Sequence, residues 1–166
     1  MLTRKTRALA ALIALSAVLF SFRIAQADFS GTWSLNESKS ELGQFGGRMA
    51  DSKISIEQKE GILTVTRTRA GMGGQEVTTK ETLTEGKESE VAINASIKKK
   101  STLKWAADGQ SFTLSYVISG DFNGNAFEWK GTETWAIAAD GKTFSLTGTL
   151  NTPQGEVTTK AAYDKK

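Results

Sequence analysis

The segment GTWSLNESKS, residues 31–40, sets a pattern that most of the chain repeats. Trp33 and Leu35 alternate with polar residues, as in a strand with one buried and one solvated face, and Phe29 continues the same face upstream. A non-strand link is expected from residue 37 to 51, in which Ser38 and Glu41 are spaced to cap one helical turn. The pattern raises the question of whether Trp33 fills a protein interior or faces a space that takes a ligand.

Ten runs of this kind follow residue 28, and each is rich in Thr, Ser, Val, Ile and aromatic residues. The links between them are hairpin-sized, and two carry the Asp-Gly pair that suits a two-residue turn. Tight turns between successive strands predict an antiparallel meander. The expected strands are residues 29–36, 52–58, 61–69, 75–83, 88–95, 100–106, 110–118, 125–138, 142–150 and 155–163.

An open sheet of ten strands leaves two unpaired edges, and closure into a barrel is the simplest way to remove them. The alternation agrees, because one face of each strand is apolar and the other carries mostly Thr, Ser, Lys and Glu. We therefore predict an all-β protein whose antiparallel up-and-down meander of about ten strands closes into a barrel.

The first 27 residues resemble an export signal. Basic residues at positions 4, 5 and 7 precede an apolar stretch over residues 8–22, and Ala25-Gln26-Ala27 forms a small-residue cleavage site. We expect cleavage after Ala27, a secreted or periplasmic protein, and one mature domain over residues 28–166. An uncleaved membrane anchor is the alternative, which the short and serine-interrupted stretch disfavours.

The net charge changes sign when the expected signal is removed. The first 27 residues hold four of the 21 basic residues and none of the 18 acidic ones, so residues 28–166 carry a net charge of −1. That balance argues against binding to nucleic acid or to a membrane surface. The basic run Lys98-Lys99-Lys100 is expected to be a solvated turn.

Cysteine and histidine are both absent. Packing and sheet closure must therefore hold the domain together without disulfides. The lack of histidine removes the commonest general base, the usual base partner of a serine or cysteine nucleophile, and the commonest transition-metal ligand. We expect no catalytic residue, no metal site and no cofactor.

The segment DFSGTWSLNESKS, residues 28–40, together with ten meandering strands, resembles the calycin group. It is more closely similar to small secreted bacterial lipocalin-like proteins that open with a Gly-Thr-Trp strand followed by an Asn and a Lys-Ser pair. The resemblance implies a lipocalin-like barrel that binds a small ligand. The sequence does not show the arginine near the C-terminus or the C-terminal helix that are typical of true lipocalins. The strand count is closer to the fatty-acid-binding subgroup, although a short link replaces that subgroup's two helices.

Strict alternation places four charged residues on the apolar face: Arg67, Arg69, Glu81 and Glu133. Burying an unpaired charge is costly, so such residues are usually paired or functional. In the functional interpretation, the arginines hold the anionic head of an amphipathic ligand. The alternatives are an Arg-Glu network that plugs the interior, or a strand that has left the barrel by residue 67.

The four tryptophans and Tyr116 also share the inward parity. They either fill the barrel or line the apolar part of a ligand. The predicted ligand-binding set therefore has nine members: Arg67, Arg69, Glu81, Glu133, Trp33, Trp105, Trp129, Trp135 and Tyr116.

The leading functional hypothesis is a monomer that binds a small apolar or amphipathic anionic molecule without catalysis. The alternative is a protein-interaction or protease-inhibitor barrel of the cell envelope, which would present its N-terminal segment and the link over residues 37–51. A third hypothesis is an enzyme that uses Glu133 or Glu81 as acid or base. A carrier should have an open interior and co-purify with its ligand, whereas an inhibitor barrel can be filled.

Overall fold

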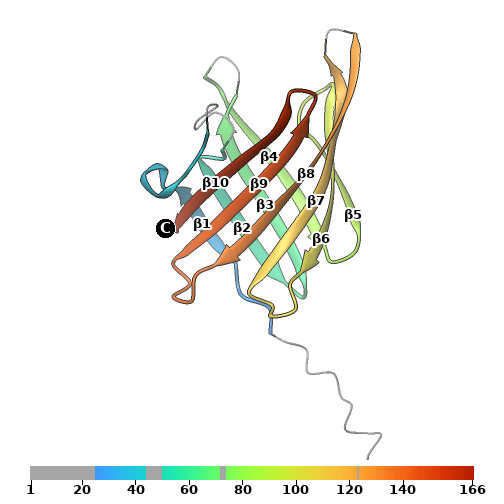
Figure 1. The fold of residues 1–166 in the computed structure, drawn as a ribbon. Helices are drawn as coiled ribbons and strands as arrows, with labels where there is room; N and C mark the ends of the chain where they lie inside the picture. Colours follow the sequence, from blue (N-terminus) through green and yellow to red (C-terminus); the bar gives the residue numbers. More distant parts are fainter. Residues whose placement is uncertain (1–24, 44–49, 72–73, 123) are drawn as a thin grey trace, which may run out of the picture.

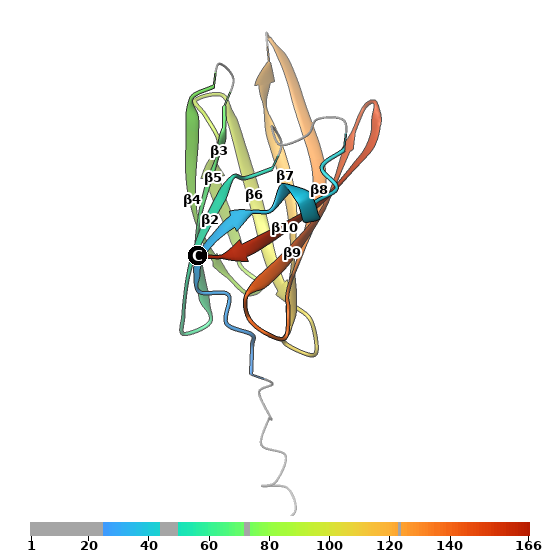
Figure 2. The same ribbon diagram turned by 90° about the vertical axis from the view of Figure 1, so that its left-hand side faces the viewer.

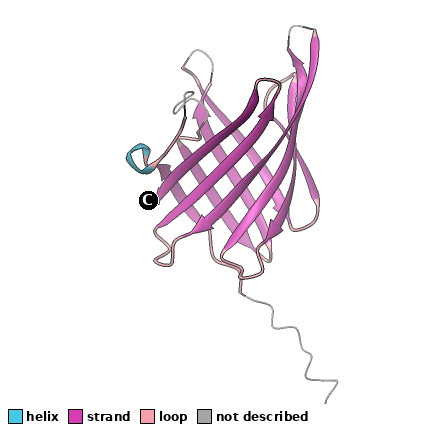
Figure 3. Ribbon diagram, in the orientation of Figure 1, coloured by secondary structure: helices cyan, strands magenta, loops and turns pink. Residues whose placement is uncertain are grey.

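The computed structural model describes residues 25–43, 50–71, 74–122 and 124–166 (Figure 1). Most of the expected signal segment, residues 1–24, lies outside the described residues. Strands make up almost all of the described chain, with one short helical segment (Figure 3). The elements are β1 (Gly31–Leu35), η1 (Glu37–Lys39), β2 (Lys53–Lys59), β3 (Ile62–Ala70), β4 (Glu76–Thr84), β5 (Glu88–Ala92), β6 (Ile97–Trp105), β7 (Ser111–Phe122), β8 (Asn125–Ile137), β9 (Thr143–Thr152) and β10 (Gly155–Lys165).

The ten strands form one antiparallel sheet in the order β4-β3-β2-β1-β10-β9-β8-β7-β6-β5. Strands that follow one another in the chain are paired, except β4 and β5, and β1 also pairs with β10 and so joins the two halves. The sheet curls on itself until its two edge strands, β4 and β5, lie side by side. The predicted up-and-down barrel is confirmed.

The barrel is nearly closed where β4 turns into β5. The backbone N–H of Gly86 donates to the carbonyl oxygen of Leu103 on β6 at 3.0 Å, and the N–H of Trp105 donates to Oε1 of Glu85 at 3.1 Å. These bonds tie the turn across β5 to the next strand. The two edge strands therefore meet at this end of the barrel, although no ladder of hydrogen bonds between β4 and β5 is present in the described residues.

Two local predictions are wrong. The short helical turn is present as η1, but Asn36 caps it by accepting a hydrogen bond from the N–H of Lys39, and Ser38 lies inside it. The run of three lysines is not a solvated turn, because β6 begins at Ile97 and includes all three. Lys99 consequently points into the barrel and is only 8% exposed.

The barrel interior has two different halves. The core end is the end at which β2 passes to β3, β6 to β7 and β8 to β9, and aromatic rings fill it. Phe29 enters there ahead of β1 and lies 4.9 Å, centroid to centroid, from Phe112. The fully or almost fully buried side chains include Phe29, Trp33, Ile54, Leu63, Leu83, Leu103, Phe112, Leu114, Trp135, Phe144 and Tyr163.

The opposite end, at which β3 passes to β4, β5 to β6 and β9 to β10, is called the open end. Its inward-facing residues are only half-buried, and they include Arg69, Val77, Val91, Ile93, Ile118, Trp129, Leu150 and Val157. Figure 2 shows the same strands from the side, with the short helical segment η1 beside the C-terminal strand β10. Among the described residues, no helix combines the length and apolarity needed to cross a membrane.

Candidate ligand-binding site

A cluster of charged side chains separates the aromatic core from the open end. Arg67 of β3 donates through Nη1 to Oδ2 of Asp51 at 3.1 Å and through Nη2 to Oε2 of Glu133 on β8. Glu133 also accepts from Nε1 of Trp135 at 3.1 Å, and Nζ of Lys99 lies 3.4 Å from its Oε1. Arg67 further stacks over the Trp135 ring, with its Cζ 4.8 Å from the centroid. The cluster therefore packs against the side of the aromatic core that faces the open end.

Burial and pairing act against each other on these groups. Burial alone would raise the pKa of Glu133, but the charges of Arg67 and Lys99, with hydrogen bonds from Arg67 and Trp135, hold the pKa at about 2. For Asp51, burial outweighs the charge of Arg67 and raises the pKa of the carboxyl. For Lys99, burial outweighs the charge of Glu133 and lowers the pKa of the amine. Arg67 and Glu133 therefore form the firmly ionised pair of the cluster.

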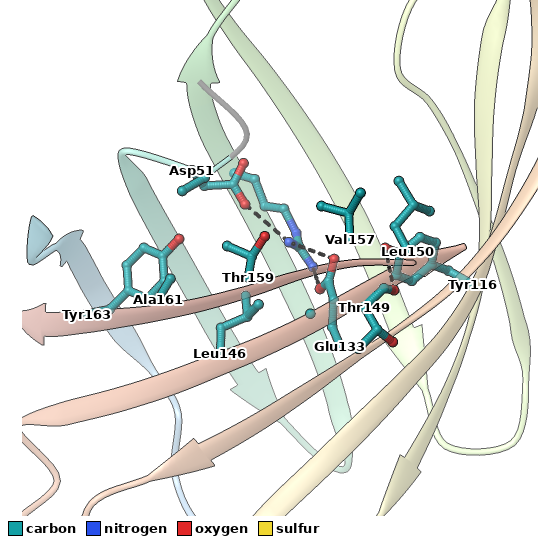
Figure 4. A pocket seen from close by; sticks show the side chains of 13 residues that line it. Asp51, Tyr116, Glu133, Leu146, Thr149, Leu150, Val157, Thr159, Ala161 and Tyr163 are labelled. Carbon is teal, nitrogen blue, oxygen red and sulfur yellow. Dashed lines mark hydrogen bonds and ion pairs between the residues drawn. The ribbon is translucent and has the colours of Figure 1, made fainter. Parts of the chain in front are cut away.

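Two cavities meet at this cluster. One has a volume of about 100 Å³ and lies along the inner face of β9 and β10, and Figure 4 shows the side chains that line it. The other has a volume of about 140 Å³ and lies along the inner faces of β3 to β7. Both are lined by Asp51, Arg67, Tyr116, Glu133 and Leu150. The interior above the core is therefore partly open and is divided by the ion pairs.

The larger of these cavities combines charge with apolar wall. It is lined by three cationic and three anionic side chains, together with the apolar Val91, Ile93, Ile118 and Leu150. Tyr116 lies between the cavities, with Nζ of Lys99 4.6 Å from its ring centroid. Burial raises the pKa of the Tyr116 hydroxyl, which donates to the carbonyl oxygen of Thr149 at 3.4 Å. This surface offers both a polar region and an apolar one to a bound molecule.

Arg69 and Glu81 stand apart from the paired groups. None of the ion pairs among the described residues involves Arg69, which is half-buried and lines the 140 Å³ cavity. Glu81 is 5% exposed, and no described residue donates a hydrogen bond to its Oε1. Arg69 is thus the cation of this cavity that is available to a ligand, whereas both terminal nitrogens of Arg67 are already bonded.

A hollow of about 530 Å³ lies on the outer face of β5 to β8. It is bordered by charged side chains that form ion pairs with one another. Nζ of Lys100 lies 2.7 Å from Oε1 of Glu88, and Nζ of Lys130 lies 3.7 Å from Oε1 of Glu128. Exposed pairs of this kind contribute little and leave no charge to be matched. The interior cavities are therefore the better candidate despite their smaller size.

The structure brings together Arg67, Glu81, Glu133 and Tyr116 from the predicted set, with Arg69 at the open side of the same cavity. The inward direction of the four charged residues agrees with the predicted alternation. The alternative in which the strand leaves the barrel by residue 67 is wrong, because β3 stays paired with β4 through Ala70.

The four tryptophans separate. Trp33 and Trp135 are fully buried and Trp105 is 7% exposed, so these three belong to the core and none lines either cavity. The indole N–H of Trp33 donates to the carbonyl oxygen of Phe29 at 2.9 Å, an internal partner that a packed ring needs. Trp129 is half-buried near the open end, with its ring 4.7 Å from that of Phe127.

Sequence reasoning missed Asp51 and Lys99. Lys99 shares the parity of Leu103 and Trp105, and a strand begun three residues earlier would have placed it inside. Asp51 precedes β2 in a link without periodicity, so no signal in the sequence marks it. Among the described residues, no group of three or more acidic side chains is arranged to hold a metal ion.

The sequence matches no protein-family model and no curated protein. The fold is similar to a solved structure of zebrafish ileal bile acid-binding protein complexed with cholic acid, with a TM-score of 0.51 and 19% sequence identity. The similarity covers 83% of this chain and 98% of that one. At this identity the likeness concerns the fold, which is a calycin-like barrel of ten strands.

Proposed function

We propose that this protein binds a small amphipathic molecule in the open half of its barrel and catalyses no reaction on it. The observation that carries the proposal is the division of the interior. Buried aromatic residues fill the core end, whereas the cavity nearer the open end is lined both by charged side chains without an ion-pair partner among the described residues, Arg69 and Glu81, and by apolar side chains. A fold shared with a bile acid-binding protein supports the same class of activity, because such barrels can enclose a ligand.

The polar head of the ligand is proposed to lie beside Arg69 and Lys99, with its apolar part along Val91, Ile93 and Ile118. An anionic head suits this position, because Arg69 has no ion-pair partner among the described residues while Arg67 is already bonded to Asp51 and Glu133. A charge-assisted hydrogen bond contributes about 1.5 to 3 kcal/mol, which is enough to orient a small ligand.

The site of action is proposed to be outside the cytoplasm, in the periplasm or medium, after cleavage behind Ala27. In the folded chain Ala27 is tied down: its N–H donates to the carbonyl oxygen of Gly109 at 2.8 Å, and its own carbonyl accepts from Nε2 of Gln58 at 3.0 Å. A protease needs an extended and accessible bond, so cleavage should come before the barrel folds.

Native mass spectrometry of the protein from its own host, before and after organic extraction, tests whether a ligand is bound. Calorimetric titration with decanoate then tests the head position. We expect Arg69→Met to weaken decanoate binding at least tenfold, whereas Lys80→Met, on the exposed outer face of β4, should leave it unchanged. No bound molecule from the host and no binding of decanoate or other amphiphiles up to millimolar concentration would contradict the proposal and favour the protein-binding alternative.

A further inference from the structure

Glu81 is a buried carboxylate whose position the anion-binding proposal does not explain. It lies on the inner face of β4 opposite Val65, is 5% exposed and lines the 140 Å³ cavity. Arg67 and Lys99 are close enough for a long-range electrostatic interaction with Glu81, but neither lies within the 4 Å of an ion pair. Its Oε1 receives no hydrogen bond from any described residue.

Leaving a buried acceptor without a hydrogen bond destabilises a protein, and the cost is greater when the group is charged. Three further buried polar atoms find no hydrogen-bond partner among the described residues, namely Nε of Arg67, Oγ of Ser101 and, within the core, Nε1 of Trp105. The carboxylate of a simple fatty acid offers only acceptors. In the 140 Å³ cavity it could accept from Nε of Arg67, but it would repel Glu81 and leave Oε1 of Glu81 without a donor.

We propose, on the basis of the proposed function, that the ligand is a hydroxylated amphipathic acid and that Glu81 accepts a hydrogen bond from its hydroxyl group. The carboxylate of the ligand meets Arg69 or Lys99, and the hydroxyl reaches Glu81 from within the same cavity. One such ligand satisfies the cations and the unpartnered carboxylate together. A site built to bond a hydroxyl discriminates strongly against the analogue that lacks it, because the buried group is then left unpaired.

The test compares decanoate with 2-hydroxydecanoate and 3-hydroxydecanoate by calorimetric titration of the protein purified from its own host. We expect at least one hydroxylated acid to bind wild-type protein roughly tenfold more tightly than decanoate, as a hydrogen bond to a charged group would provide. Glu81→Leu should abolish this preference without weakening decanoate. Glu81→Gln keeps a carbonyl acceptor of the same size and should keep only part of the preference.

Glu76→Gln is the matched control, since Glu76 is exposed on the outer face of β4, and it should leave the preference intact. Equal binding of all three acids would overturn the inference, with a water molecule as the donor to Glu81, and would leave the proposed function standing. A preference that persists in full in both Glu81 variants would also overturn it. If Glu81→Leu does not fold, Glu81→Gln decides: a preference reduced at least twofold supports the inference and an unchanged one refutes it. Binding of none of the acids would instead overturn the proposed function.

Discussion

Replacing Arg67 by Met should destabilise the barrel strongly. The Arg67 side chain is 13% exposed and is the ion-pair partner of two carboxylates that are themselves 10% and 13% exposed, Asp51 and Glu133. Methionine has a similar length but no charge and no N–H donor. After the substitution Glu133 keeps Lys99 and Trp135 as partners, whereas Asp51 loses the only ion pair it makes with a described residue.

Removing one partner of a buried pair typically costs 3–5 kcal/mol, because the remaining charge is left desolvated. Domains of this size are stable by about 5–15 kcal/mol, so the expected loss is a large share of the total. The free energy of unfolding is measured by urea titration near pH 7, followed by tryptophan emission and circular dichroism. We expect Arg67→Met to lose about 3–5 kcal/mol relative to wild type.

Two variants separate the ion pair from the loss of a long side chain. Arg69→Met makes the same substitution two residues away on the same face of β3, where no ion pair is present among the described residues, and should cost less than about 1 kcal/mol. Arg67→Met combined with Asp51→Leu removes the carboxylate that the single variant leaves unpaired, while Glu133 keeps Lys99 and Trp135, and it should recover at least about 2 kcal/mol, since apolar replacement of a buried pair is often neutral or stabilising.

An Arg67→Met protein within about 1 kcal/mol of wild type would refute this reasoning. So would a double variant that is no more stable than the single one, because the single variant's loss would then not come from an unpaired carboxylate. If Arg67→Met fails to fold, a folded double variant still separates the two explanations.

Three further predictions concern pH, packing and processing. Arg67 holds the folded pKa of Glu133 near 2, below its ordinary value of 4.5, so the stability that Glu133 contributes is present above about pH 4.5 and is lost as the pH falls toward 2. Between those pH values wild type should therefore lose more stability than a Glu133→Met variant, which lacks this carboxylate, and parallel curves of unfolding free energy against pH would contradict this. Gly131→Ala should cost about 1–3 kcal/mol, because its Cβ would lie 2.4 Å from the carbonyl oxygen of Thr149 and 2.5 Å from the Tyr116 ring, whereas Gly148→Ala, with no atom nearer than 3.7 Å, should be neutral; equal stabilities in urea unfolding would exclude the steric reason. N-terminal sequencing of protein from the cell envelope or medium should begin at Asp28, and a soluble protein that retains Met1 would show that no cleavage takes place.

Period-2 alternation and turn residues predict ten strands and most of their inner faces, with the start of β6 and the inward Lys99 as exceptions. Each strand, 5 to 13 residues long, is specified by its local residues, and glycine at positive φ, as at Gly109 and Gly141, supplies the hairpin turns. Even the inward direction of Arg67 and Glu133 followed from parity alone. Their separation by 66 residues in the chain, however, says nothing of whether they meet.

Depth inside the barrel was decided only by the tertiary structure. Trp33 and Trp129 have the same parity, yet Trp33 is sealed in the core and Trp129 is half-buried near the open end. Parity states which face a residue occupies but not how far it lies from the end that Phe29 and its aromatic neighbours close. The same limit applies to Asp51 and Lys99, which join the charged cluster because distant strands bring them within reach of Arg67 and Glu133. Ion pairs and cavities depend on the spatial distances between residues on strands that are far apart in the chain. An alternating pattern determines only which face of the sheet each side chain points to.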